Sequence, residues 1–275
     1  MAADLVLIKL GGSLLTDKTQ PESLRMDILR RVAGEIADLA RERQGGVVVG
    51  HGSGSFGHVT AARWRVHEGV QAAPDGADPL EGISRTQHLA ARLHRRVVAE
   101  LLAAGARPWS FVPSSASTTA RGRIASFDGA SLEQALDLGL LPVTYGDVLM
   151  DREQGCAIAS TEAIFEALAE ALERRGWTVG ACLWLGETDG ILDRAGRRIP
   201  EIRPGEADDL LPTVGGSAGT DVTGGMRLRL ETALRLAAKG IESWILDGRQ
   251  PQVFGRALAG DAGLGGTHVA RSPRS

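Results

Sequence analysis

Apolar positions along the chain recur with two different spacings, which predict strands and helices in alternation. Short, nearly continuous apolar runs are typical of buried strands, and they cover residues 5–10, 47–49, 109–112, 141–145, 178–185 and 241–246. Apolar residues three or four positions apart, such as Leu24, Ile28 and Val32, predict an amphipathic helix between the first two strands. Further helices are predicted over residues 84–104, 132–138, 161–174 and 226–239, a hairpin over 148–158 and a last short strand over 267–270.

Strands that alternate with helices indicate an α/β fold. We expect a three-layer αβα sandwich whose central sheet is mainly parallel and is covered by helices on both faces. No linker interrupts the pattern, so residues 1–275 are predicted to form a single domain, with an N-terminal lobe over about 1–175 and a C-terminal lobe over about 176–270. Residues 66–82 contain Pro, Gly and Asp with weak periodicity and are predicted to be a mobile loop or lid.

The composition argues against several classes of protein. The formal net charge is −3 and no block of Lys and Arg is concentrated, so we expect no nucleic-acid partner. No apolar run approaches the length of a membrane span, and the N-terminus lacks the basic start of a signal peptide, so we expect a soluble, cytoplasmic protein with no membrane partner. Cys156 and Cys182 lie in apolar runs and are predicted to be core residues.

Glycine-rich turns follow the first two predicted strands directly. The first turn contains Gly11-Gly12-Ser13, and the second runs from Gly50 to Gly57. In open α/β sheets ligands bind beyond the carboxyl ends of the strands, and glycines there let backbone N–H groups approach phosphate oxygens. The alternative is two tight turns that need glycine for a positive φ. Two such turns after consecutive strands favour phosphate binding, although neither turn is a P-loop.

Lys9 is the most informative single residue, because it interrupts an apolar strand. A buried ammonium group is costly unless it finds a partner, and the flanking Ile8 and Leu10 indicate a buried strand. The alternative is an edge strand, or a side chain that reaches solvent. Taken alone, Lys18 would be a solvated loop charge and His58 a core or helix-capping histidine.

These motifs carry a family resemblance. Ile8-Lys9-Leu10-Gly11-Gly12-Ser13 resembles the opening of the amino acid kinase superfamily, and the segment from Gly52 to His58 narrows the resemblance to the isopentenyl phosphate kinase family. Two later segments, 145–148 and 220–226, match in the same order, so the resemblance covers nearly the whole chain. It implies the amino acid kinase fold, with an N-terminal lobe that binds the acceptor and a C-terminal lobe that binds the nucleotide.

The resemblance also implies roles for individual residues. The catalytic residues would be Lys9, Lys18, His58 and Arg229, with His58 donating a hydrogen bond to the acceptor phosphate. Acceptor binding would involve Gly52, Ser53, Gly54, His58, Ser160, Thr161 and Glu162. ATP binding would involve Lys9, Gly11, Gly12, Ser13, Lys18, Asp189, Thr220, Asp221, Gly225 and Arg229. No protein side chain would bind a metal directly, since Mg²⁺ would be held by the ATP phosphates.

Three positions depart from the family pattern. Arg229 stands where the family commonly has lysine, and its planar guanidinium replaces a compact ammonium group. Glu162 stands where the family has the aspartate that organises the active-site lysines. In the segment from Gly186 to Gly190, only the final Asp189-Gly190 matches the family motif, which leaves the nucleotide contacts there open.

The activity implied by the resemblance is ATP- and Mg²⁺-dependent phosphorylation of isopentenyl phosphate to isopentenyl diphosphate by a homodimer. The fosfomycin kinases of the same superfamily share the Phe56-Gly57-His58 segment and are the nearest alternative. A carboxylate or carbamate kinase is a further alternative, against which His58 argues. A non-catalytic nucleotide-binding protein on the same fold also stays open because of Arg229 and Glu162.

Overall fold

The computed structural model describes residues 4–17, 19–72, 76–203, 205–206, 210, 225–261 and 263–272. Its main sheet consists of β1 (Leu5–Leu10), β2 (Val47–His51), β3 (Pro108–Ser110), β6 (Leu141–Tyr145), β9 (Val179–Gly186), β12 (Glu201–Ile202), β13 (Glu242–Asp247) and β14 (Thr267–Val269). The strand order is β12-β14-β13-β9-β1-β2-β6-β3, and only the β13–β14 pair is antiparallel among these strands. The predicted α/β sandwich with a mainly parallel sheet is confirmed.

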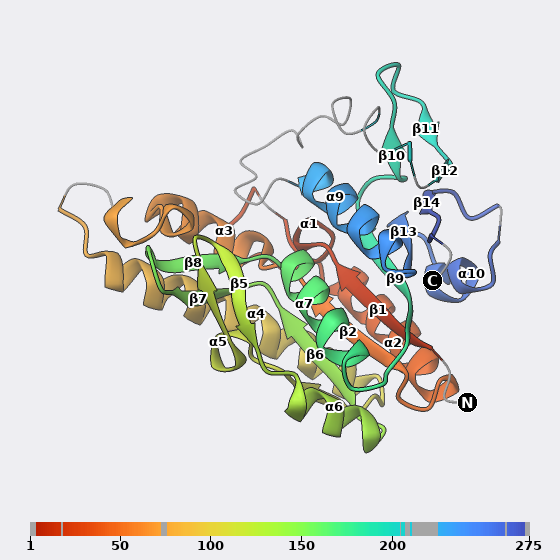
Figure 1. Cartoon of the computed structure of the whole chain (residues 1–275), viewed down its shortest axis with the longest axis horizontal. Helices are drawn as coiled ribbons and strands as arrows, with labels where there is room; N and C mark the ends of the chain where they lie inside the picture. Colours follow the sequence, from red (N-terminus) through yellow and green to blue (C-terminus); the bar gives the residue numbers. More distant parts are fainter. Residues whose placement is uncertain are drawn as a thin grey trace.

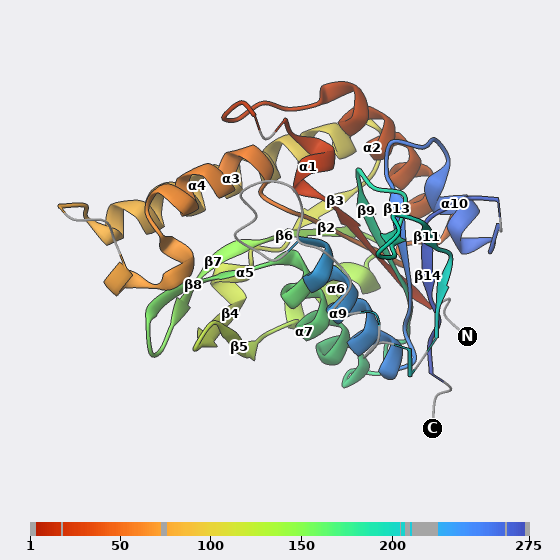
Figure 2. The same ribbon diagram turned by 90° about the horizontal axis from the view of Figure 1, so that it is seen from above.

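Helices cover both faces of this sheet. One face is covered by α2 (Met26–Glu42), α4 (Pro79–Ala103) and α10 (Val253–Leu258), and the other by α6 (Ala130–Asp137), α7 (Thr161–Glu173) and α9 (Gly225–Ala238). Figure 2 shows α2 and α4 on one side of the sheet and α7 and α9 on the other. All six helices are amphipathic or buried segments whose apolar side chains complete one of two cores.

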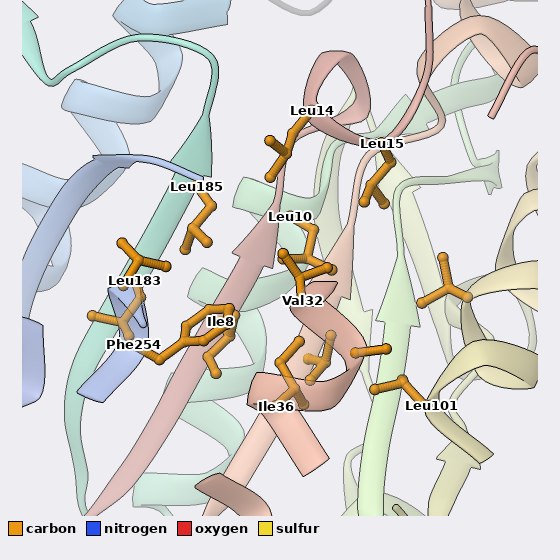
Figure 3. Packing of buried hydrophobic residues seen from close by; sticks show 14 of the residues in the cluster. Ile8, Leu10, Leu14, Leu15, Val32, Ile36, Leu101, Leu183, Leu185 and Phe254 are labelled. Atoms are coloured by element: carbon orange, nitrogen blue, oxygen red, sulfur yellow. The ribbon is translucent and has the colours of Figure 1, made fainter. Parts of the chain in front are cut away.

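The alternation of side chains along β1 decides which residues face which layer. Val6, Ile8 and Leu10 pack into the core beneath α2, α4 and α10, which Figure 3 shows from close by. Leu5 and Leu7 pack into the core on the opposite face. Because successive side chains of a strand point to opposite faces, Lys9 lies on the side of the sheet that carries α7 and α9.

Local sequence signals explain where the functional helices begin. Asp78 caps α4 by accepting a hydrogen bond from the Leu80 N–H at 2.9 Å, and Pro79 occupies the first turn, where its missing N–H costs nothing. Ser160 caps α7 by accepting a hydrogen bond from the Ala163 N–H. These caps fix the starting points of α4 and α7 (Figure 1).

A second, smaller sheet differs from the sequence-based expectation. It consists of β4 (Ser117–Ala120), β5 (Arg123–Phe127), β7 (Asp147–Asp151) and β8 (Gly155–Ala159), in the order β5-β4-β7-β8. The predicted hairpin is confirmed as β7–β8. The β4–β5 hairpin was missed because its strands are short and largely polar, so they show no clear hydrophobic alternation.

Several short elements were also missed. The glycine-rich turns continue into α1 (Gly12–Leu15) and α3 (Gly54–Arg63), and α5 (Pro113–Ala116), β10 (Ile191–Leu192) and β11 (Arg198–Ile199) are likewise new. The predicted loop over residues 66–82 contains the two 3₁₀ turns Val66–Glu68 and Val70–Ala72 and the first turn of α4, with residues 73–75 outside the described part. Within the described residues, no helix combines the length and apolarity needed to cross a membrane.

Candidate active site

A buried ion pair joins the first strand to α7. Lys9 is the penultimate residue of β1 and pairs in register with Gly50 of β2 and Trp184 of β9, so β1 is a central strand and the edge-strand alternative is wrong. Its Nζ atom lies 2.7 Å from Oε1 of Glu162 in the first turn of α7. Both residues are 6% exposed. The partner that a buried lysine requires is therefore Glu162, one of the residues that departs from the family pattern.

Arg229 adds a second cation to this charge cluster. It belongs to α9, is buried, and has its guanidinium so close to Gly186 that a Cβ atom there would lie 2.8 Å from Nη1. Burial by itself would raise the pKa of Glu162. The nearby charges of Lys9 and Arg229 together outweigh the effect of burial, so the pKa of Glu162 lies below its usual range. The cluster of Lys9, Glu162 and Arg229 thus holds two cations and one anion, a net charge of +1.

The two glycine-rich turns pack directly against each other. A Cβ atom on Gly12 would lie 2.5 Å from the backbone nitrogen of Gly54, and one on Gly52 would lie 3.0 Å from that of Gly12. Among these three glycines only Gly54 has a positive φ, at 50°. Glycine is therefore needed at positions 12 and 52 for close approach of the two backbones rather than for a left-handed turn.

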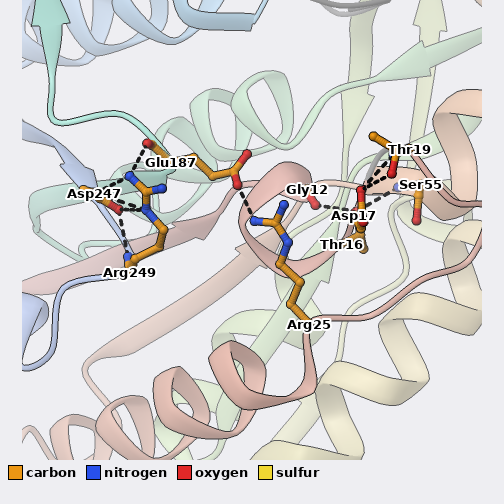
Figure 4. Close-up of polar contacts among 9 residues, drawn as sticks. All are labelled: Gly12, Thr16, Asp17, Thr19, Arg25, Ser55, Glu187, Asp247 and Arg249. Carbon is orange, nitrogen blue, oxygen red and sulfur yellow. Dashed lines mark hydrogen bonds and ion pairs between the residues drawn. The ribbon is translucent and has the colours of Figure 1, made fainter.

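Thr16 ties the two turns together and was not identified from the sequence. Its hydroxyl donates to the Gly12 carbonyl at 2.7 Å and accepts from the Ser55 N–H at 2.9 Å, as Figure 4 shows. The side chain is fully buried. The only signal in the sequence was its place directly after the first glycine turn, and that signal does not distinguish it from the neighbouring polar residues.

Backbone N–H groups differ in their availability along the second glycine-rich turn, residues 50–57, here called the acceptor turn because the resemblance assigns acceptor binding to it. The Gly52 N–H donates to the Leu10 carbonyl at 3.0 Å, so it is already used, contrary to the expectation that it would bind the acceptor phosphate. The N–H groups of Ser53 and Gly54 donate to no other group in the described part of the chain. His58 lies on α3 one helical turn after Gly54, and its side chain is half-buried.

The first glycine-rich turn also contains both occupied and available backbone N–H groups. The Gly11 N–H donates to the Leu185 carbonyl at 2.7 Å, which fixes the turn against β9. Gly12 and Ser13 begin α1, and their N–H groups have no acceptor among the residues that the structure describes. Gly12 and Ser13 therefore fit the predicted role of phosphate donors, while Gly11 acts through its position.

Ser160 and Thr161 set the position of Glu162. The Thr161 hydroxyl donates to the His51 carbonyl at 2.7 Å. The absence of a side chain on Gly50 allows this approach, because a Cβ atom there would lie 2.6 Å from the Thr161 methyl group. The first turn of α7 is thereby held at the end of β2. Direct contacts of Ser160 and Thr161 with the acceptor stay a prediction.

The remaining predicted nucleotide residues are only partly described. The Asp189 carboxylate accepts from the Gly266 N–H at 2.7 Å and lies 3.5 Å from Arg198. Gly225, with a φ of 45°, is the first residue of α9. Lys18, Thr220 and Asp221 lie outside the described residues, so their predicted contacts are not compared with the structure.

An arginine network holds the loop that follows β9. The Arg249 guanidinium donates to the Asp247 carboxylate at 2.7 Å and to the Glu187 carbonyl at 2.8 Å (Figure 4). The Glu187 side chain pairs with Arg25, which precedes α2. The departure from the family motif at Glu187 therefore has a structural use, because this side chain joins the end of β9 to the segment before α2.

Three stacked rings beside the acceptor turn were also missed by sequence reasoning. His51, His94 and Tyr145 are at most 2% exposed, and their ring centroids lie 4.5–5.7 Å apart. Burial lowers the pKa of His51 to about 4 and that of His94 to about 2. Both imidazoles are therefore neutral at physiological pH.

The two neutral histidines predict a loss of stability in acid. Because their pKa values are lower in the folded than in the unfolded chain, the unfolded chain binds more protons below pH ~6.5, and stability falls as the pH falls. Between about pH 6 and pH 5 the pair should remove about 2 kcal/mol from the free energy of unfolding. Urea unfolding at several pH values between about 6 and 5 measures this loss of unfolding free energy. The double variant His51→Asn/His94→Asn should flatten the dependence, and an unchanged slope would contradict the assignment.

The assembled site is suited to holding phosphates. Lys9 and Arg229 supply positive charge at the carboxyl ends of the central strands, and four N–H groups from two adjacent turns are available as donors. The one carboxylate among them, Glu162, is engaged by Lys9. Such a site can neutralise and orient anionic groups, which is the main requirement of phosphoryl transfer.

Comparisons with known proteins identify the family of the chain. The sequence model described as the amino acid kinase family matches residues 4–247. The isopentenyl phosphate kinase of Haloferax volcanii is 36% identical over 85% of this chain and 89% of its own length, and that of Methanothermobacter thermautotrophicus is 31% identical over 94% and 96%. A solved isopentenyl phosphate kinase structure superposes with a TM-score of 0.78 at 27% identity, covering 96% of this chain and 99% of the other. The chain therefore belongs to the amino acid kinase family, and within it to the isopentenyl phosphate kinases.

Proposed function

We propose that this chain transfers the γ-phosphoryl group of ATP to isopentenyl phosphate and so forms isopentenyl diphosphate. The observation that carries the proposal is the pairing of buried Lys9 with Glu162 beside two turns that meet at Gly12 and Gly54. Cations and free N–H groups face a common edge of the sheet, where two phosphates must be held end to end. The isopentenyl phosphate kinases to which the chain is similar support the choice of acceptor.

The chemistry needs no general base. A phosphate monoester has a second pKa of about 6, so its oxygen is already anionic at neutral pH. This oxygen attacks the γ-phosphorus, the bond from that phosphorus to the β,γ-bridging oxygen breaks, and ADP leaves with the bonding electrons. Lys9 and Arg229 reduce the repulsion between the two anions, and the resemblance adds Lys18 to this set.

The acceptor phosphate would be bound by the second turn. The N–H groups of Ser53 and Gly54 have no other partner among the described residues, and His58 follows on α3. Hydrogen bonds from backbone N–H groups to a dianion are charge-assisted and therefore strong. Together they would hold the acceptor oxygen in line with the bond that breaks.

The isoprenoid tail needs an apolar surface beyond His58. Val66, Val148 and Cys156 form a small buried cluster between the end of α3 and the β7–β8 hairpin, and Trp64 and Ile83 pack against it partly buried. This cluster is separate from the two large cores. We propose that the tail lies against the partly buried side chains of this cluster, Trp64 and Ile83.

Mg²⁺ is expected to enter with ATP. The donors at the turns are N–H groups, and the nearby Glu162 carboxylate is already bound to Lys9, so the site fits phosphate oxygens better than a bare cation. The ion would be held by the ATP phosphates and would supply further neutralisation of their charge. We also propose, from the family resemblance, a cytoplasmic homodimer without nucleic-acid or membrane partners. The same resemblance assigns acceptor binding to residues 1–175 and nucleotide binding to residues 176–270.

An ATP-consumption assay with three acceptors tests the proposed function. Isopentenyl phosphate should be phosphorylated, whereas fosfomycin and acetylglutamate should give rates near background, because they lack either the shape or the dianionic phosphate that the site is built to hold. Turnover of fosfomycin at a higher kcat/KM than isopentenyl phosphate would replace the proposal with the fosfomycin kinase alternative. No ATP-dependent product from any acceptor would remove the catalytic assignment.

Removing one backbone donor tests how the acceptor phosphate is bound. Ser53 has a φ of −77°, which proline adopts, so Ser53→Pro should delete the N–H with little strain. We expect KM for isopentenyl phosphate to rise about tenfold, the value of one charge-assisted hydrogen bond. Ser53→Ala keeps the N–H and is the matched control. Equal effects of both substitutions would show that the hydroxyl, and not the N–H, is the donor.

A further inference from the structure

A hydrogen-bonded chain of two histidines ends at the acceptor turn. His51 is the last residue of β2, and its Nδ1 atom lies 3.1 Å from the carbonyl oxygen of Gly52. Its Nε2 atom lies 3.2 Å from Nδ1 of His94, which comes from the middle of α4. Tyr145, which pairs with His51 in the β2–β6 register, stacks on both rings. The reaction as derived above uses none of these three side chains.

The geometry fixes the position of both imidazole protons. A carbonyl oxygen only accepts hydrogen bonds, so His51 must carry its proton on Nδ1 and donate it to Gly52. Its Nε2 atom is then an acceptor, so His94 must donate from its own Nδ1. The Nε2 atom of His94 is buried and has no partner in the described part of the chain. The two hydrogen bonds therefore run in one direction: His94 donates to His51, and His51 donates to the Gly52 carbonyl.

These hydrogen bonds determine the direction in which the Ser53 N–H points. In a planar trans peptide the carbonyl of one residue and the N–H of the following residue point in opposite directions. With the Gly52 carbonyl held towards His51, the Ser53 N–H is turned to the opposite side, where it has no partner among the described residues. Glycine allows a peptide unit to rotate more freely than any other residue, so without such a bond the Gly52–Ser53 peptide would be free to turn over.

We propose that His51 and His94 are positioning residues for the acceptor phosphate: His94 orients the imidazole of His51, and His51 locks the Gly52–Ser53 peptide with the Ser53 N–H aimed at the phosphate. Neither histidine touches the substrate. The inference rests on the proposed function in so far as the phosphate that it positions is that of isopentenyl phosphate.

Replacement of His51 separates this role from simple packing. Asparagine places an amide nitrogen near the position of Nδ1 and can keep the bond to Gly52, whereas leucine fills similar space without a donor. His51→Leu should raise KM for isopentenyl phosphate about tenfold, with KM for ATP within about twofold of wild type, and His51→Asn should restore most of the loss. Equal increases in both KM values, or no rescue by asparagine, would overturn the inference.

His94 and Ser53 provide two independent checks. His94→Leu should raise KM for the acceptor by about threefold, a smaller increase than that of His51→Leu, since His94 acts through His51. This variant replaces His51→Leu in the test if His51→Leu fails to fold. In the Ser53→Pro background the N–H is gone, so adding His51→Leu should produce no further increase in acceptor KM. Fully additive effects of the two substitutions would show that His51 does not act through this peptide.

A crystal structure of a leucine variant separates the inference from the proposed function. If the inference is right, the Gly52–Ser53 peptide of His51→Leu, or of His94→Leu if the former does not fold, should be turned or split between two orientations. An unchanged single orientation would overturn the inference whatever the acceptor is. Failure of the wild-type protein to phosphorylate isopentenyl phosphate would refute the proposed function alone, because the peptide orientation is read without any substrate.

Discussion

Lys9→Met should lower kcat for phosphoryl transfer about 10²–10³-fold, the usual effect of removing one preorganised group that stabilises charge in a transition state. Lys9 is held at the end of β1 by its 2.7 Å ion pair with Glu162, so its ammonium group does not have to reorganise during the reaction. Steady-state kinetics with isopentenyl phosphate and ATP measures the effect. A kcat within about threefold of wild type would remove Lys9 from the catalytic residues.

The same cluster predicts stability losses of different size for the two members of its ion pair. Without Lys9, Glu162 still faces the charge of Arg229, so Lys9→Met should cost only about 1 kcal/mol of unfolding free energy. Glu162→Gln instead removes the buried carboxylate with which both Lys9 and Arg229 interact and should cost about 3 kcal/mol. Added ATP should recover part of that loss, because its phosphates restore negative charge. Thermal unfolding of both variants with and without ATP tests this order, and a less stable Lys9→Met would reverse it.

His58→Ala should lower kcat/KM for isopentenyl phosphate about 10²–10³-fold, because it removes a hydrogen bond to a charged phosphate and the alignment that this bond provides. His58 follows the N–H groups of Ser53 and Gly54 by one turn of α3, next to the turn that we propose binds the acceptor. KM for ATP should change by no more than about twofold.

A second histidine provides the control for this substitution. His88 is exposed on α4 and is none of the residues to which catalysis or binding is assigned, so His88→Ala should leave both kcat and KM unchanged. Thermal unfolding of His58→Ala should stay close to that of wild type, since His58 is only half-buried. If His58→Ala keeps near-normal turnover of the phosphorylated acceptor, His58 does not bind the phosphate and the acceptor side of the proposal must be revised.

The sequence predicted the parts of the site that depend on local chemistry. A lysine inside an apolar strand needs a partner, and glycines directly after strands permit close backbone contacts, so Lys9 and the two turns were identified without coordinates. The alternation of strands and helices likewise sufficed to predict a mainly parallel sheet, because burial of both faces leaves a distinct hydrophobic pattern. The structure confirms the sheet and the burial of Lys9.

Contacts between distant segments were beyond this reasoning. Glu162 looked like an imperfect match because sequence alone does not show how far α7 stands from β1. The distance between α7 and β1 depends on Gly50, because its missing side chain lets Thr161 approach the end of β2. Glu162 thereby lies within 2.7 Å of Lys9. The free and occupied N–H groups of the glycine turns also depend on which carbonyls lie opposite them.

The amino-acid sequence by itself determined the strand and helix pattern, the two glycine-rich turns and the need of Lys9 for a counter-charge, since each follows from the properties of neighbouring residues. Only the tertiary structure decided that Glu162 supplies the counter-charge of Lys9 and that Arg229 acts on the same carboxylate. It also decided that Gly12 meets Gly54 and that His94 is hydrogen-bonded to His51 beside the acceptor turn. These contacts join residues far apart along the chain, and their distances are set by the packing of helices on both faces of the sheet rather than by any local pattern.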